Sequence, residues 1–237
     1  MLLLSACFGS TCFAFTAPLE MLSENDLAAR ATTLAGARLN DIASAIGQPL
    51  PKNLLRHKGA IGQLIEMYLG ATARARPEPD FPEIGVELKT LPIKLSGKPA
   101  ESTHICSITL SSLVGSSWPT SLVYRKLKRV LWVPFEADKN IDISDRRVGT
   151  PFFWTPSDRD AIFLQRDWEE HMELLSTGNF SLLSAHQGKY LQVRPKAANS
   201  QALAPSVNCR GNPSRNLPRG FYLRSTFTAK ILESAFG

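Results

Sequence analysis

Cysteine is scarce in this sequence, which has only Cys7, Cys12, Cys106 and Cys209 among its 237 residues. The four show no C-x-x-C spacing and no accompanying histidine cluster, so the sequence predicts neither a zinc site nor a disulfide framework. Reduced thiols are typical of intracellular compartments, and we therefore expect a cytoplasmic protein.

The apolar stretch at the start of the chain, residues 1–17, lacks the features of a targeting segment. A secretory signal has a Lys or Arg before its hydrophobic run, and this stretch has none. It is also too short to span a membrane. We predict that residues 1–20 are an extension outside the fold, or that the start is mis-assigned and Met21 initiates the chain. Residues 21–237 are expected to form one domain with two lobes, and no membrane partner is expected.

The chain carries a modest positive charge of +6, with a pI near 9.3, and contains no internal repeat. Its basic residues are clustered, which favours a polyanionic partner such as nucleic acid more strongly than the net charge does. The clusters are residues 125–129, Arg146 with Arg147, Arg194 with Lys196, and Arg215, Arg219 and Arg224.

The most informative stretch is residues 80–89, which begins with aspartate and ends in Glu-Leu-Lys. Apolar and β-branched residues from Ile84 to Ile93 predict a short core strand, bounded by Pro82 and Pro92. A strand here would place charged side chains at the border of a core, which is where catalytic groups need to be held.

Three charged residues of this stretch are expected to share one site. Side chains alternate faces along a strand, so Glu87 and Lys89 project from the same side with their bases about 6.6 Å apart. A bend upstream of the strand would return the carboxylate of Asp80 to Glu87. The alternative is that Glu87 and Lys89 form the solvated face of an ordinary edge strand, because so short a pattern matches many sequences by chance.

Such a site suits metal-dependent hydrolysis of a phosphodiester. Mg²⁺ prefers oxygen ligands and commonly uses one or two carboxylates together with waters and substrate phosphate, and Asp80 and Glu87 fit that need. An ammonium beside the ion, here Lys89, can hold the attacking water or stabilise the pentacovalent phosphate. The stretch therefore predicts a metal-dependent nuclease.

Longer blocks of sequence follow one another in a fixed order from about residue 20 to near the C-terminus. They are KG at 58–59, LIEMYLGA at 64–71, GVELKT at 85–90, KLKRVLW at 126–132, RRVG at 146–149, YLQVRPKAAN at 190–199 and LPRGFYL at 217–223. Together these blocks resemble the MutH family, the strand-nicking endonucleases of methyl-directed DNA mismatch repair, and they are far more specific than the short pattern.

The resemblance implies both a fold and an activity. The fold is α/β of the restriction-endonuclease-like, PD-(D/E)xK type, with a mixed central sheet flanked by helices and two lobes around a DNA cleft. The activity is Mg²⁺-dependent nicking, with two ions, of the unmethylated strand at hemimethylated GATC in double-stranded DNA, leaving a 5′-phosphate. The resemblance also implies a MutL-type mismatch-repair ATPase as a partner and, indirectly, MutS, while a single catalytic copy without an internal repeat favours a monomer.

The resemblance also adds active-site residues. It makes Glu66 a third active-site acid and Lys126 a second active-site lysine, and it adds the backbone carbonyl of Leu88 to the carboxylates of Asp80 and Glu87 as a metal ligand. From the residues alone, Glu66 would be a solvent-facing carboxylate beside the apolar stripe of a helix, and Lys126 would belong to a solvated basic surface. Lys58, Lys128 and Arg129 are expected to contact DNA.

Two segments near the C-terminus are expected to read the DNA sequence. Arg194-Pro195-Lys196 places two donors around a rigid proline, and such donors suit guanine O6 and N7 in the major groove. Of the adjacent rings of Phe221 and Tyr222, which face opposite sides of a strand, one should be buried. Tyr222 could be that core ring, but the resemblance places it against the adenine N6 edge, where an added methyl group would collide with it.

The periodicity of the remaining sequence predicts alternating helices and strands. Helices are expected at residues 23–35, 40–46, 59–69, 120–128 and 157–178, with capping boxes at Ser23 and Ser157. Strands are expected at residues 103–110, 130–135, 190–193 and 218–223, with a loop at 111–119 and a polar linker from 197 to about 214. His104 is assigned no role, because a lone histidine in a strand is more often structural than catalytic.

Two other functions compete with a nicking enzyme. A related GATC-specific restriction endonuclease would share the catalytic core but cut both strands, usually as a dimer or a fused double module, whereas this chain has one catalytic copy. A non-cleaving DNA-binding module would not need an acidic cluster facing phosphate, so Asp80 and Glu87 argue against it.

Overall fold

The computed structural model describes residues 22–51, 59–73, 76–113, 115–184, 186–196, 203–207, 210 and 212–237. The helices are α1 (Glu24–Thr32), α2 (Leu39–Ala45), α3 (Ala60–Leu69), α4 (Leu122–Leu127), α5 (Asp158–Ser176) and α6 (Ser225–Phe236), with short 3-10 turns η1 (Leu110–Ser112), η2 (Trp118–Thr120) and η3 (Phe180–Leu182). The strands are β1 (Glu87–Ile93), β2 (Thr103–Ser107), β3 (Val130–Glu136), β4 (Phe152–Trp154), β5 (Leu191–Pro195), β6 (Ala204–Val207), β7 (Pro213–Asn216) and β8 (Arg219–Leu223). Residues 1–20, Met21, Lys58, Cys7, Cys12 and Cys209 lie outside the described part of the chain.

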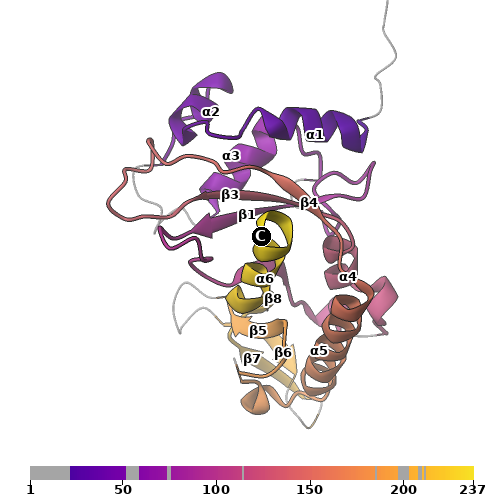
Figure 1. The fold of residues 1–237 in the computed structure, drawn as a ribbon. Helices are drawn as coiled ribbons and strands as arrows, with labels where there is room; N and C mark the ends of the chain where they lie inside the picture. The colour runs from indigo at the N-terminus through magenta and orange to yellow at the C-terminus, as the bar shows by residue number, and fades with distance from the viewer. Residues whose placement is uncertain are drawn as a thin grey trace, which may run out of the picture.

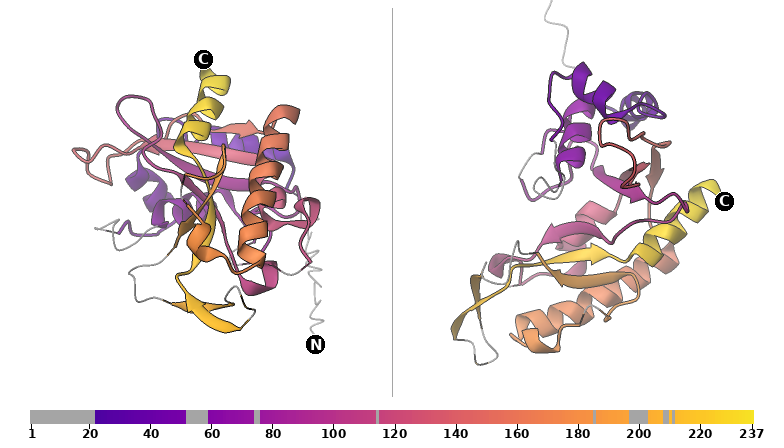
Figure 2. Two further views of the ribbon diagram at one scale, coloured as in Figure 1. Left: turned by 90° about the horizontal axis from the view of Figure 1, so that it is seen from below. Right: turned by 90° about the vertical axis from the view of Figure 1, so that its left-hand side faces the viewer.

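The fold is mixed α/β, and its strands form small sheets between helices (Figure 1). One sheet has the order β1-β3-β4, with β1 and β3 parallel and β3 and β4 antiparallel, so the prediction of a mixed sheet flanked by helices is confirmed. A second sheet, of order β2-β8-β5, is antiparallel, and β6 pairs with β7. In the side view, α1–α3 lie at one end of the molecule and α5 with the second sheet at the other (Figure 2).

Strand β3 is buried on both faces and joins two hydrophobic clusters. Leu131 and Val133 point into the cluster made with α1–α3, whereas Val130 and Trp132 point into the cluster made with α4–α6 and the second sheet. A strand covered on both sides has a continuous apolar sequence rather than an alternating one, which explains the run Val-Leu-Trp-Val-Pro-Phe. The sheet that carries β1 is therefore held firmly from both sides.

The predicted catalytic strand is displaced from its expected limits. The segment from Phe81 to Val86 forms a tight turn, closed by two backbone hydrogen bonds of 2.9 and 3.2 Å between these two residues, and the strand begins only at Glu87. Gly85 stands in this turn with φ of +66°, a conformation that favours glycine. The prediction that Pro92 ends the strand was wrong, because β1 is an edge strand and the missing N–H is tolerated there.

Several other expectations need correction, and two are confirmed. The predicted capping box of Ser23 is formed at the start of α1, and at the start of α5 Ser157 Oγ accepts from the backbone N–H of Asp160, which is the N-cap half of the predicted box. The predicted loop at 111–119 begins and ends in 3-10 turns, and the predicted linker contains β6 and the start of β7, which pair with each other. Helix α6 and strand β4 were not predicted at all. Across the described ranges, no helix combines the length and the apolar character needed to cross a membrane.

Candidate active site

The turn before β1 brings the carboxylate of Asp80 against the start of the strand. The backbone N–H of Leu88 donates to Asp80 Oδ2 at 2.9 Å, and the backbone N–H of Asp80 donates to Glu87 Oε2 at 3.2 Å. Both acids are buried, with exposed fractions of 8% for Asp80 and 1% for Glu87. The two carboxylates are therefore held side by side by the backbone that connects them.

Two lysines from different elements converge on Glu87. Lys126, on the last turn of α4, donates to both Glu87 oxygens at 2.8 Å each, and Lys89 donates to Glu87 Oε1 and, at 3.1 Å, to the backbone carbonyl of Leu88. Lys89 and Glu87 thus lie on the same side of β1, as the strand alternation predicted. Lys126 is 39 residues away in sequence, and only the parallel pairing of β1 with β3 brings α4 to this position.

Glu66 on α3 faces the same group of charges. Its side chain is half-buried, and its pKa is raised first by burial and then by the negative charges of Asp80 and Glu87, while Lys89 opposes the shift. Helix α3 packs on β1 at Gly62, where an added Cβ would stand 3.7 Å from Thr90 Oγ1 on the strand and 3.8 Å from Glu66 Oε1. The expectation of a purely solvent-facing carboxylate does not describe this position.

The charges at this site favour the protonated form of Lys89. Burial alone would lower the pKa of Lys89, but the carboxylates of Glu87 and Asp80 outweigh it and the pKa is raised. Burial raises the pKa of Glu87, and Lys89 and Lys126 oppose that shift. Glu87, at the border of the core, is thus paired with the side chains of two lysines.

The oxygen atoms of this cluster fit a hard divalent cation. Asp80, Glu87 and the Leu88 carbonyl offer oxygen only, and the Lys89 ammonium already contacts two of these three groups, which shows that they converge on a positive charge. Among the residues that the structure describes, no set of three or more acidic, histidine or cysteine side chains is arranged to hold a metal ion. An ion here would depend on two carboxylates, a carbonyl, waters and phosphate, the combination that Mg²⁺ commonly uses.

The second sheet carries the residues predicted to read DNA. Arg194 and Lys196 are exposed at the end of β5 on either side of Pro195, where Arg194 donates to Ser102 Oγ at 2.7 Å and Lys196 donates to Ser107 Oγ at 3.0 Å. On β8 the buried ring is Phe221, with an exposed fraction of 3%, whereas Tyr222 is half-buried on the opposite face. The alternative that Tyr222 is the core ring is therefore not supported.

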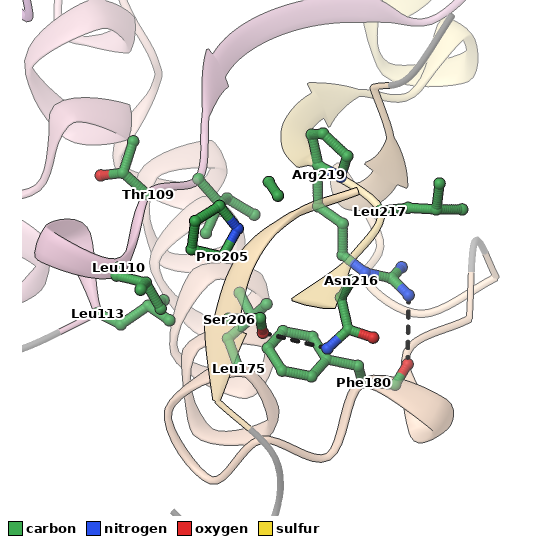
Figure 3. A pocket seen from close by; sticks show the side chains of 13 residues that line it. Thr109, Leu110, Leu113, Leu175, Phe180, Pro205, Ser206, Asn216, Leu217 and Arg219 are labelled. Carbon is green, nitrogen blue, oxygen red and sulfur yellow. Dashed lines mark hydrogen bonds between the residues drawn. The ribbon is translucent and has the colours of Figure 1, made fainter. Parts of the chain in front are cut away.

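The same strand presents a different kind of residue to its other face. Arg219 points into a small pocket beneath β8, where it donates to the carbonyl oxygen of Phe180 at 3.5 Å (Figure 3). Its guanidinium also lies 5.9 Å from the Phe180 ring, and burial lowers the pKa of the arginine. Arg219 thus ties β8 to η3 and belongs to the support of the strand rather than to the face that bears Tyr222.

Three arginines of the basic clusters have structural partners. Arg129 forms an ion pair with Glu24 on α1, donates to Thr155 Oγ1 at 3.1 Å and lies over the Phe153 ring. Arg146 and Arg147 donate to backbone carbonyls at 3.1 and 2.7 Å. These contacts explain the arginines without DNA, whereas Lys128 is exposed; the predicted contact of Lys58 falls on a residue that the structure does not describe.

One residue beside β8 received no role from the sequence. His104 on β2 lies directly opposite Tyr222 on β8, with ring centroids 5.0 Å apart. The two positions are far apart in sequence, and no local pattern relates them. Only the pairing of the strands could have identified the contact.

Comparison with known proteins agrees with this geometry. Residues 69–167 match the family model for MutH, described as DNA mismatch repair enzyme MutH. The chain is 51% identical over 220 residues to the DNA mismatch repair protein MutH of Shewanella sp. (strain W3-18-1), covering 93% of this chain and 98% of that protein. It is 47% identical over 214 residues to the protein of the same name from Vibrio vulnificus (strain YJ016), covering 90% and 94%.

Residues 69–167 include Asp80, Glu87, Lys89 and Lys126, and the matched relatives extend the similarity over nearly the whole chain, including both sheets. About half of the residues are identical over nearly the full length, which shows family membership and not only a common fold. The chain belongs to the MutH family of DNA mismatch repair enzymes.

Proposed function

We propose that this protein is a Mg²⁺-dependent endonuclease of DNA mismatch repair that nicks the unmethylated strand at hemimethylated GATC sites. The observation that carries the proposal is the convergence of Asp80, Glu87, Lys89 and Lys126 at the start of β1. An acidic pair with two ammonium groups fits a phosphodiester, because carboxylates alone would repel the substrate and ammonium groups alone would not bind a metal ion.

The residues of the cluster divide the chemistry between them. Asp80, Glu87 and the Leu88 carbonyl would hold Mg²⁺, which supplies an acidified water and neutralises charge that develops on the phosphate. Lys89 would orient the attacking water, and Lys126 would stabilise the additional negative charge of the pentacovalent phosphate. Glu66 would complete the acidic side of the site, where a second ion would bind.

Recognition is assigned to the outer face of the second sheet. Arg194 and Lys196 would donate to guanine, with Pro195 holding the backbone, and Tyr222 would lie against the adenine N6 edge and exclude an added methyl group. Lys128 and Lys58 would contact phosphates; Arg129 could do so only by leaving Glu24. Residues 21–237 would then form one PD-(D/E)xK domain whose two lobes enclose the duplex.

The proposed enzyme is a cytoplasmic monomer that a MutL-type ATPase directs to DNA. MutS would act before that ATPase and so affect the enzyme indirectly. A restriction endonuclease of the same specificity remains the nearest alternative. It would cut both strands of an unmethylated duplex in one binding event, whereas a monomer with one catalytic cluster is expected to release a nicked intermediate. A non-cleaving binding module would leave the duplex intact.

The test compares cleavage and binding in the same variants. Asp80→Ala and Lys89→Ala are expected to abolish nicking of a hemimethylated GATC duplex with Mg²⁺, while binding to that duplex, measured with Ca²⁺ by fluorescence anisotropy, persists. Lys94→Ala, which removes an exposed lysine just beyond the same strand, is the control and should cut normally. Near wild-type nicking by Asp80→Ala would show that the site is wrongly placed.

A further inference from the structure

The ring of Tyr222 is held between its two neighbouring strands. His104 on β2 stands directly opposite it, with ring centroids 5.0 Å apart and ring planes at 66°, which is an edge-to-face contact. From the other side, the guanidinium of Arg194 on β5 lies 6.0 Å from the Tyr222 ring. Tyr222 is thus half-buried on the central strand β8, and one side chain from each neighbouring strand flanks its ring.

The backbone around His104 is shaped to seat the imidazole. The pairing of β2 with β8 shifts register between His104 and Cys106, a bulge that changes the direction of the side chain before it. Gly220 is paired with Ser107 just beyond the bulge, and a Cβ added there would lie 2.9 Å from the carbonyl oxygen of Cys106 and 3.1 Å from His104 Nε2. A side chain at position 220 would therefore collide with the imidazole and the adjacent backbone, so the glycine leaves the room that the ring occupies.

The imidazole acts as a neutral aromatic ring. Burial lowers the pKa of His104 to about 4, and the charges of Lys196, Lys89 and Lys126 act in the same direction. Its Nε2 atom is buried and has no hydrogen-bond partner among the described residues. A histidine in this state is poorly suited to act as a base or a phosphate ligand, but its ring can restrict the orientation of an adjacent ring.

We propose that His104 is a positioning residue that fixes the ring of Tyr222 and thereby sets how strongly the enzyme discriminates against a methylated adenine. This inference rests on the proposed function, since Tyr222 must be the group that meets the adenine. A methyl group is excluded only by a ring that cannot swing away. A tyrosine freed from its edge-to-face partner reaches other rotamers and makes room for the added carbon.

The main experiment measures nicking rates on an unmethylated and a methylated GATC strand with purified full-length protein and Mg²⁺. In His104→Ala, the ratio of the two rates should fall by about threefold to tenfold, the range that corresponds to one aromatic pair, while the rate on the unmethylated strand stays within about twofold of wild type. His104→Phe keeps the ring and should restore the ratio. His186→Ala, which removes an exposed histidine elsewhere, is the matched control.

A second measurement follows the Tyr222 ring without DNA or metal. In protein labelled with ¹³C-tyrosine, the Tyr222 resonance, assigned from Tyr222→Phe, should shift in His104→Ala and stay near its wild-type position in His104→Phe. Thermal unfolding of both variants checks that they fold. This readout tests the ring contact even if the wild-type protein fails to discriminate, a result that would overturn the proposed function and with it the role of His104.

Each remaining outcome also decides the matter. An unchanged rate ratio in His104→Ala would overturn the proposal, as would equal losses on both strands, which would indicate a purely structural role. Failure of His104→Phe to restore the ratio would show that an imidazole nitrogen rather than the ring is required. If both variants unfold, the tyrosine resonance of His104→Leu, which keeps bulk without a ring, decides between aromatic contact and simple packing.

Discussion

Lys126→Met is expected to destabilise the protein because it removes one of the two ammonium groups that hold Glu87. The Glu87 side chain is 1% exposed, and Lys126 donates to both of its oxygens at 2.8 Å. Removing one partner of a buried ion pair costs about 3–5 kcal/mol. Lys89 remains in contact, so we expect a loss of roughly 2 kcal/mol, about half of that range.

The assay is urea-induced unfolding at pH 7.5 in EDTA, followed by circular dichroism. In a separate thermal unfolding experiment, a loss of this size corresponds to a fall in Tm of about 4–8 °C for a chain of this length. Lys128→Met changes an exposed lysine two positions away and should alter the free energy of unfolding by less than about 0.5 kcal/mol. Adding Glu87→Gln to Lys126→Met should recover part of the loss, because the buried carboxylate charge is then removed while Lys89 loses its partner.

The pH dependence of the same variant provides a second test. Without Lys126, the folded-state pKa of Glu87 lies still further above its unfolded value, since burial already raises it. A carboxyl group whose pKa is higher in the folded than in the unfolded protein does not lower the free energy of unfolding below its unfolded pKa, near 4.5, where it is protonated in both states. It lowers the free energy of unfolding increasingly as the pH rises through the folded pKa. The destabilisation should therefore be largest at neutral pH and vanish toward pH 4.5. A Lys126→Met protein as stable as wild type at pH 7.5 would refute this account of the site.

Three further predictions concern other residues. Because burial raises the pKa of Glu66, Glu66→Gln should raise the free energy of unfolding at neutral pH and lose that gain near pH 4.5. The variant should also nick DNA more slowly, and an unchanged urea midpoint at both pH values would contradict the burial argument. Asp167 accepts three backbone N–H groups at 2.6–2.9 Å at the start of β5, so Asp167→Ala should lose more than about 3 kcal/mol in urea unfolding, whereas exposed Glu169→Ala should lose little. Arg194→Ala should weaken binding to GATC by about 1–3 kcal/mol and binding to unrelated duplexes much less; equal losses on both, measured by anisotropy, would make it a phosphate contact instead.

The mixed fold and the strand that carries Glu87 and Lys89 were predictable because their signals are local. The capping contacts of Ser23 and Ser157 span three residues, and helices of this kind form wherever such a cap precedes an apolar stripe. Alternation along a strand likewise placed Glu87 and Lys89 on one side. The limits of β1 were missed, since the turn at residues 81–86 depends on its own closing hydrogen bonds and on Gly85 rather than on hydrophobic periodicity.

The amino-acid sequence by itself determined the family, the helices with strong caps, and the acids and lysine of the Glu-x-Lys segment, because these depend on neighbours a few residues apart. Tertiary structure alone decided that Lys126 reaches Glu87 and that Arg129 forms an ion pair with Glu24. It also decided that Phe221 rather than Tyr222 is buried in the core, and that His104 meets Tyr222. Such contacts join residues tens of positions apart, and their formation depends on how sheets and helices pack around a shared core, which no local pattern of side chains specifies.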